Sequence, residues 1–258
     1  MLLNSNEYTY TRFKQARGHD GDSGKIYLGT PVKTGLVPIL VKSTFYNDAI
    51  NEYIGCNLGQ NMGINTPRAW LFDPEFNKKI SGIDFKKAVA VEYLDGLVDC
   101  TASYEPNYYK QTMNGEMLHL LLGEADGISH GLYQGQMYTF DFATSLYPEA
   151  FHNTRPVLNP LFYTRLDNGF LLYRHIILGE ETYSRRQLLR YVESLVIPGI
   201  FSEEIISIYE DFKKRFLEYY DTEGYMDLIE ELELVFSSDI AEVTTRLFGG
   251  MQQALVSI

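Results

Sequence analysis

Two aspartates in the middle of the chain could perform acid–base or metal chemistry, because a predicted hairpin brings them together. Short β-rich runs at 131–133 and 137–140 flank the loop 134–136, a pattern typical of a β-hairpin. Asp126 precedes the first run and Asp141 follows the second, so both emerge at the same end of the ribbon. Two neighbouring carboxylates repel unless a cation or a shared proton lies between them. The alternative is that both are exposed turn residues.

A lysine and a glutamate nearer the N-terminus could supply a fixed positive charge. Lys42 ends an apolar strand-like run, and Glu52 lies ten residues further on, in a predicted helix. A buried lysine needs an anion, and a lysine fixed by a glutamate can hold a phosphate. The alternative is a surface lysine on an edge strand and a solvated glutamate.

A loop at residues 17–25 contains three glycines between two strand-like runs. Glycines let backbone N–H groups approach a polyphosphate closely. A glycine-rich hairpin turn has the same composition, and two aspartates in the loop add negative charge. The Gly-Lys pair is not followed by Ser or Thr, so the loop is no Walker A motif. The candidate phosphate-contacting residues of the loop are Gly18, Gly21, Ser23 and Gly24.

The elements expected around these residues divide the chain into two parts of different character. The first hundred residues hold short β-rich runs separated by Gly and Pro, with one helix at about 47–62 that ends at Gly63. A second helix ends at Gly123, and after residue 184 the apolar residues recur with the helical period. We expect an α+β protein with a β-rich part at 1–95 and a mainly helical part at 96–258.

Composition limits the classes of function. The 258 residues carry a net charge of −12 and a pI near 4.9, which disfavours direct binding of nucleic acid. Two cysteines are too few for a disulfide framework or a cysteine-built zinc site. No run of 18 apolar residues and no signal-peptide pattern occurs. We therefore expect a cytoplasmic protein without a membrane partner.

The order of these features resembles the HipA-like serine/threonine kinases, which have a bilobal protein-kinase-like fold. The resemblance covers about residues 15–145 and suggests a small N-lobe with one helix and a helical C-lobe. The motifs that carry it are Leu40-Val41-Lys42, Asn51-Glu52-Tyr53, Met62-Gly63-Ile64-Asn65-Thr66-Pro67, Leu121-Leu122-Gly123-Glu124-Ala125-Asp126 and Thr139-Phe140-Asp141-Phe142.

The resemblance implies an ATP- and Mg²⁺-dependent transfer of phosphate to a serine or threonine hydroxyl of a protein. Lys42, paired with Glu52, would contact the α- and β-phosphates. Asp126 would orient or deprotonate the acceptor hydroxyl, and Asp141 would hold Mg²⁺. The glycine loop would cover the phosphates, and an antitoxin-like protein is a candidate partner. The backbone expected to hydrogen-bond adenine is that of Glu92, Tyr93 and Leu94.

Three departures from the family pattern favour a weakened or altered catalyst. Gly131 stands where the family has a metal-binding asparagine, and His130 beside it is the candidate replacement ligand. Gly127 replaces a common basic residue, and Ala143 ends the Asp-Phe-Gly-like triplet. The alternatives to a protein kinase are therefore a pseudokinase, which binds nucleotide or a partner protein without turnover, and a small-molecule kinase of the same fold.

Overall fold

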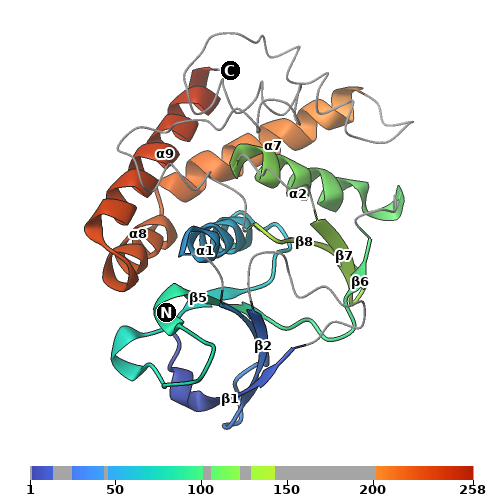
Figure 1. The fold of residues 1–258 in the computed structure, drawn as a ribbon. Helices are drawn as coiled ribbons and strands as arrows, with labels where there is room; N and C mark the ends of the chain where they lie inside the picture. Colours follow the sequence, from blue (N-terminus) through green and yellow to red (C-terminus); the bar gives the residue numbers. More distant parts are fainter. Residues whose placement is uncertain are drawn as a thin grey trace, which may run out of the picture.

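The computed structural model describes residues 2–13, 25–43, 46–100, 106–122, 129–142 and 202–257, and all structural statements below concern these residues. Their fold is mixed α+β, as expected (Figure 1). Several predicted features lie outside the described residues. They are Gly18, Gly21, Ser23, Gly24, Asp126, Gly127, the proposed activation and substrate-docking stretch 143–160, and the helix predicted to begin after residue 184.

A five-stranded antiparallel sheet forms the N-terminal part and carries Lys42 on β3. The strand order is β1-β2-β3-β5-β4, so β3 lies between two neighbours. At the β4 edge Leu3 adds a bridge to Phe72, which extends the sheet with the first residues of the chain. The strands are β1 (Tyr8–Arg12), β2 (Lys25–Pro31), β3 (Ile39–Ser43), β4 (Ala69–Leu71) and β5 (Ala88–Glu92). Short 3₁₀ helices are η1 (Ser5–Glu7), η2 (Pro74–Phe76), η3 (Phe85–Lys87) and η4 (Pro106–Tyr108).

Helix α1 (Tyr46–Asn61) lies between this sheet and the C-terminal helices (Figure 1). It ends in a Schellman motif, because the N–H of Gly63 donates to Gln60 and that of Ile64 to Gly59, with Gly63 at φ +68°. The predicted helix and its glycine stop are thus confirmed. Side chains are buried all around α1, as expected of a helix packed on both sides.

Three helices near the C-terminus pack over α1 and α2 (Tyr109–Leu122). They are α7 (Ser202–Tyr220), α8 (Glu223–Val235) and α9 (Ser238–Ser257). Ser238 and Asp239 are residue types that cap helices, but the cap of α9 is Ser237, whose hydroxyl accepts from the N–H of Ile240. None of the described helices combines the length and apolar character needed to cross a membrane.

A three-stranded sheet, in the order β6-β7-β8, packs against α2 through β8. Its strands are β6 (Val98–Asp99), β7 (Ser129–Tyr133) and β8 (Gln136–Phe140). The predicted hairpin is present as β7–β8, but its turn has two residues, Gln134 and Gly135, because Gln136 belongs to β8 and not to the loop. Both turn residues have positive φ, +48° and +76°, as a type I′ turn requires. Asp141 therefore follows directly after the second hairpin strand.

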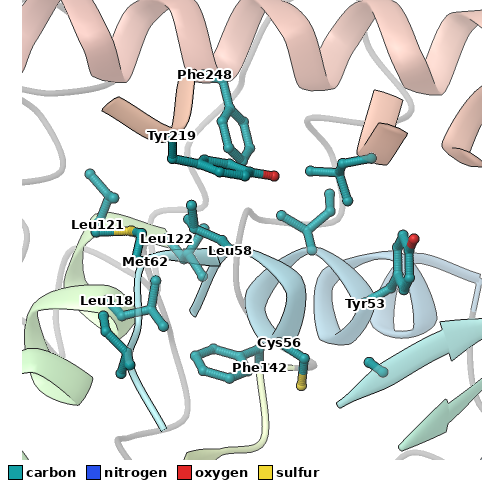
Figure 2. Close-up of a cluster of buried hydrophobic side chains, with 14 of the residues drawn as sticks. Tyr53, Cys56, Leu58, Met62, Leu118, Leu121, Leu122, Phe142, Tyr219 and Phe248 are labelled. Atoms are coloured by element: carbon teal, nitrogen blue, oxygen red, sulfur yellow. The ribbon is translucent and has the colours of Figure 1, made fainter. Parts of the chain in front are cut away.

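Two hydrophobic clusters hold these layers together. The larger one contains buried residues of α1, α2, α7, α8 and α9, so it joins the N-terminal and C-terminal parts of the chain. In Figure 2, Phe142 lies on one side of α1, while Tyr219 and Phe248 lie on the other. The smaller cluster packs the sheet against Phe72 and Phe85, whose rings meet edge to face at 4.7 Å.

Candidate active site

Lys42, Glu52 and Asp141 form one charged group, called the Lys42 cluster below. The Nζ of Lys42 lies 3.0 Å from Oε1 of Glu52 and 3.1 Å from Oδ1 of Asp141. The three side chains are 20%, 1% and 57% exposed, respectively. The structure thus brings together residues from β3, α1 and the end of β8. Of the alternatives left open by the sequence, the buried ion pair is the one observed.

Glu52 connects the lysine to the segment that follows β8. While Oε1 meets Lys42, Oε2 accepts a hydrogen bond of 3.0 Å from the N–H of Phe142. A carboxylate buried this deeply needs partners for both oxygens. Glu52 therefore fixes the position of Lys42 and of the backbone next to Asp141.

Phe142 fills a space between α1 and α2. A Cβ on Gly55 would overlap the Phe142 ring, so the ring fits only because residue 55 has no side chain. On its other side the ring stacks on His119 of α2, with centroids 4.3 Å apart and planes 19° apart. Phe142 is fully buried, so it anchors the chain immediately after Asp141.

The backbone of Asp141 is in the left-handed region, at φ +68°. This conformation costs roughly 1–2 kcal/mol for a residue with a side chain, although aspartate tolerates it better than most. Such positions persist where the surrounding structure determines them, and they occur often at functional sites. The bend places the carboxylate beside Lys42 while the next side chain enters the core.

The charges of the Lys42 cluster shift one another. Burial alone would lower the pKa of Lys42, but Asp141 and Glu52 outweigh it and raise that pKa above its ordinary value. Lys42 lowers the pKa of Asp141, against the effect of burial. Burial raises the pKa of Glu52, which the charge of Lys42 opposes. Lys42 is thus a fixed cation near neutral pH, with an ionised aspartate beside it.

Gly131 and His130, the predicted departures, lie on opposite faces of β7. A Cβ on Gly131 would lie 2.9 Å from Cδ1 of Leu97 and 3.1 Å from Cε1 of Phe140, so the family's asparagine has no room here. The buried His130 ring faces α2, where its Cε1 would be 3.1 Å from a Cβ on Gly115. His130 occupies a packing position, and its role as a metal ligand stays a prediction.

The backbone predicted to bind adenine is only partly available. The N–H of Glu92 donates to the carbonyl of Arg68, and the N–H of Tyr93 donates to that of Pro38. Within the described part of the chain, the N–H of Leu94 has no protein acceptor. Of the three predicted donors, Leu94 is therefore the one that remains for a ligand.

Asp141 is the residue of the Lys42 cluster that could hold a metal ion. Asp141 is more than half exposed, and only one of its carboxylate oxygens contacts Lys42 among the described residues. Mg²⁺ binds through one or two carboxylates plus phosphate oxygens and water, so this carboxylate suits it. No set of three or more His, Cys, Asp or Glu side chains in the described ranges could hold a metal by itself.

Several residues around the site were not predicted from the sequence. Phe142 contacts Gly55 on one side and His119 on the other, and no local pattern signals contacts across such long sequence separations. Arg215 stands in a charged run typical of the solvated face of a helix, yet its Nη1 donates to the carbonyl of Met62 at 2.6 Å. Lys214, in the same run, pairs with Glu218 at 3.6 Å.

Solved structures similar to this chain include two that differ in organism. No protein-family model matches the chain, and no curated protein matches it. The proinflammatory kinase CtkA of Helicobacter pylori is 14% identical, with a TM-score of 0.47 and 97% of each chain covered. HipA of Shewanella oneidensis MR-1, solved with HipB and operator DNA, is 15% identical, with a TM-score of 0.49; 98% of this chain and 73% of that one are covered. Both TM-scores are below 0.5, so neither likeness carries an argument about the function of this chain.

Proposed function

We propose that the chain is an ATP- and Mg²⁺-dependent phosphotransferase of the HipA-like serine/threonine kinase type. The observation that carries this proposal is the Lys42 cluster, in which one lysine contacts a buried glutamate and an exposed aspartate at 3.0 and 3.1 Å. In kinases, a lysine, a glutamate and an aspartate arranged in this way hold a nucleoside triphosphate and its metal ion.

Each member of the Lys42 cluster has a distinct task in this proposal. Glu52 keeps the lysine ammonium in place, and its burial leaves it no access to a ligand. Two of the three N–H groups of Lys42 meet Glu52 and Asp141, so the third would donate to the α- and β-phosphate oxygens. Asp141 would hold Mg²⁺ through the oxygen that does not contact Lys42. When bound, the metal would neutralise the charge that develops on the transferred phosphoryl group.

The other roles are proposed from the resemblance. Asp126 would accept the proton of the acceptor hydroxyl, and the glycine loop would cover the phosphates. Leu94 would donate its backbone N–H to adenine, because it is the available donor of its segment. We also propose the two-lobe division at 95/96, a cytoplasmic location, a protein hydroxyl as acceptor and an antitoxin-like protein as a partner.

Nucleotide binding without turnover is the second candidate, favoured by the packing at Gly131. Leu97 and Phe140 fill the place of the asparagine side chain that kinases use for their second metal ion. A protein of this kind would bind nucleotide through the Lys42 cluster but transfer phosphate slowly or not at all. The two candidates differ in turnover and share the binding site.

Two measurements test the proposal. Thermal shift with ATP, with and without Mg²⁺, measures binding, and γ-labelled ATP with a panel of protein acceptors measures transfer. We expect binding in the wild type, weaker binding in Lys42→Met, and no transfer in Asp141→Asn. Asp239→Asn, a matched change of an exposed aspartate at the start of α9, should alter neither.

The outcomes separate the two candidates. Binding with transfer supports the kinase, and binding without transfer to any acceptor supports the second candidate. If the wild type binds no nucleotide, or if Lys42→Met binds as well as the wild type does, both candidates are wrong.

A further inference from the structure

His119 on α2 contacts the chain on both sides of Asp141. Its Nε2 lies 2.9 Å from Oγ1 of Thr139, two residues before the aspartate. Its ring stacks on Phe142, one residue after it. His119 itself is fully buried, so it has no access to a ligand. One rigid side chain thus holds the segment from 139 to 142 from within the core.

The hydrogen bond to Thr139 has a defined direction. The Thr139 hydroxyl donates its single proton to the carbonyl of Ser129 at 3.2 Å. Its oxygen must therefore accept the proton on Nε2 of His119, since the hydroxyl has no second proton to give. This assigns the N–H of the ring to Nε2 and locks both the imidazole and the threonine.

The segment needs such support because Asp141 has an unfavourable backbone conformation. Its φ of +68° is one that residues with a side chain seldom adopt. The N–H of Thr139 donates to Asn65 and the N–H of Phe142 to Glu52, so the backbone is fixed on both sides of the bend. His119 adds the side-chain contacts that keep these two residues in register.

We propose that His119 is a positioning residue that holds the Asp141 carboxylate in place for a nucleotide-bound Mg²⁺. The inference depends on the proposed function only in that Asp141 is the metal ligand. Lys42 is attached to β3 and Glu52 to α1, so neither relies on His119 for its place. Loss of His119 therefore weakens the Mg²⁺-dependent part of nucleotide binding and leaves the metal-free part intact.

Four variants separate the two contacts that His119 makes. His119→Phe keeps the stacked ring and loses the donor, whereas His119→Gln keeps a donor and loses the ring. His119→Ala loses both, and Thr139→Val removes the acceptor while retaining the shape. The matched control is Thr244→Val in α9, which removes another buried hydroxyl far from the hairpin in the fold.

The first readout is the affinity for a non-hydrolysable ATP analogue, measured by calorimetry with and without Mg²⁺. Removing a residue that orients a metal ligand typically weakens metal binding by roughly 10- to 100-fold. Mg²⁺ should raise the affinity of the wild type for the analogue, and we expect this increase to be about 10-fold smaller in His119→Ala. The variants that lose a single contact should show a smaller change. The inference is overturned if the affinity falls equally with and without Mg²⁺. It is also overturned if neither His119→Ala nor Thr139→Val weakens binding in the presence of Mg²⁺.

The second readout needs no nucleotide. The carboxylate of Asp141 lies 3.1 Å from Nζ of Lys42 and covers it on one side, so an aspartate that turns away should leave that nitrogen more open to acetic anhydride. We expect faster acetylation of Lys42 in His119→Ala and an unchanged rate in Thr244→Val. A wild type that binds no nucleotide refutes the proposed function, and this rate then decides the inference by itself: a rate in His119→Ala equal to that of the wild type overturns it.

Discussion

Replacing Lys42 by methionine would isolate the charge of Glu52 in the core. Methionine keeps most of the length of the side chain but removes its ammonium. Glu52 is 1% exposed, and its other neighbour in the Lys42 cluster, Asp141, is negative. Removing one partner of a buried ion pair costs roughly 3–5 kcal/mol. Because Lys42 is itself partly exposed, we expect the free energy of unfolding to fall by about 3 kcal/mol at a pH where Glu52 is ionised.

The size of this loss should depend on pH. Burial raises the pKa of Glu52 even beside Lys42, and removing the lysine raises it further. A carboxyl group whose folded pKa lies above its unfolded pKa stabilises the protein fully below the unfolded value. That stability is lost as pH rises through the folded value. The stability that Lys42→Met loses relative to the wild type should therefore be smallest in mild acid, where Glu52 takes up a proton. It should be largest above neutral pH.

The assay is thermal denaturation of four proteins near pH 5.5 and near pH 8: the wild type, Lys42→Met, Glu52→Gln and the double variant. At about pH 8 we expect Lys42→Met to melt roughly 6–12 °C below the wild type, from about 2–4 °C per kcal/mol in a chain of this size. The double variant should be more stable than Lys42→Met there, because no buried charge remains. An equal loss at both pH values, or no recovery in the double variant, would refute the buried pair.

Three further substitutions test the packing that positions the site. Gly55→Ala should destabilise the protein by roughly 1–3 kcal/mol and weaken nucleotide binding, because its methyl group would displace the ring of Phe142. The control Gly249→Ala in α9 should be neutral or stabilising, and thermal melts compare the two. Arg215→Ala should cost about 1–2 kcal/mol through its bond to the C-terminal end of α1, against less than about 0.5 for the exposed Lys214→Ala, both from urea titrations. Gly131→Asn, which supplies the family's side chain, should lower the melting temperature and add no Mg²⁺ dependence to nucleotide binding, since Leu97 and Phe140 occupy its space.

Much of the fold could be predicted from local sequence. The hairpin at 129–140 follows from alternating β-rich runs around Gln134-Gly135, and the end of α1 follows from Gly63, since these signals act over a few residues. The cap of α9 is harder to predict, because Ser237, Ser238 and Asp239 follow one another and all are capping residue types, so only the backbone geometry selects among them.

The site could be predicted only where residue type and order carry the information. A lysine on an apolar strand and a glutamate on the next helix suggested the buried pair, and the hairpin suggested where Asp141 emerges. The stacking of His119 on Phe142 could not be predicted, because it depends on how α2 crosses the end of β8. The use of two backbone N–H groups at Glu92 and Tyr93 by the protein itself is likewise a matter of tertiary pairing.

Gly131 shows why a departure from a family pattern has to be interpreted in three dimensions. From the sequence it is the simple loss of a metal-binding side chain. In the structure it pairs with Tyr138 and Asp99 in the middle of the β6-β7-β8 sheet, and its missing Cβ admits Leu97 and Phe140. Restoring an asparagine alone would therefore break this packing before it could bind a metal. In the proposed function the metal would therefore depend on Asp141, whose backbone lies at φ +68° and whose carboxylate lies 3.1 Å from Lys42.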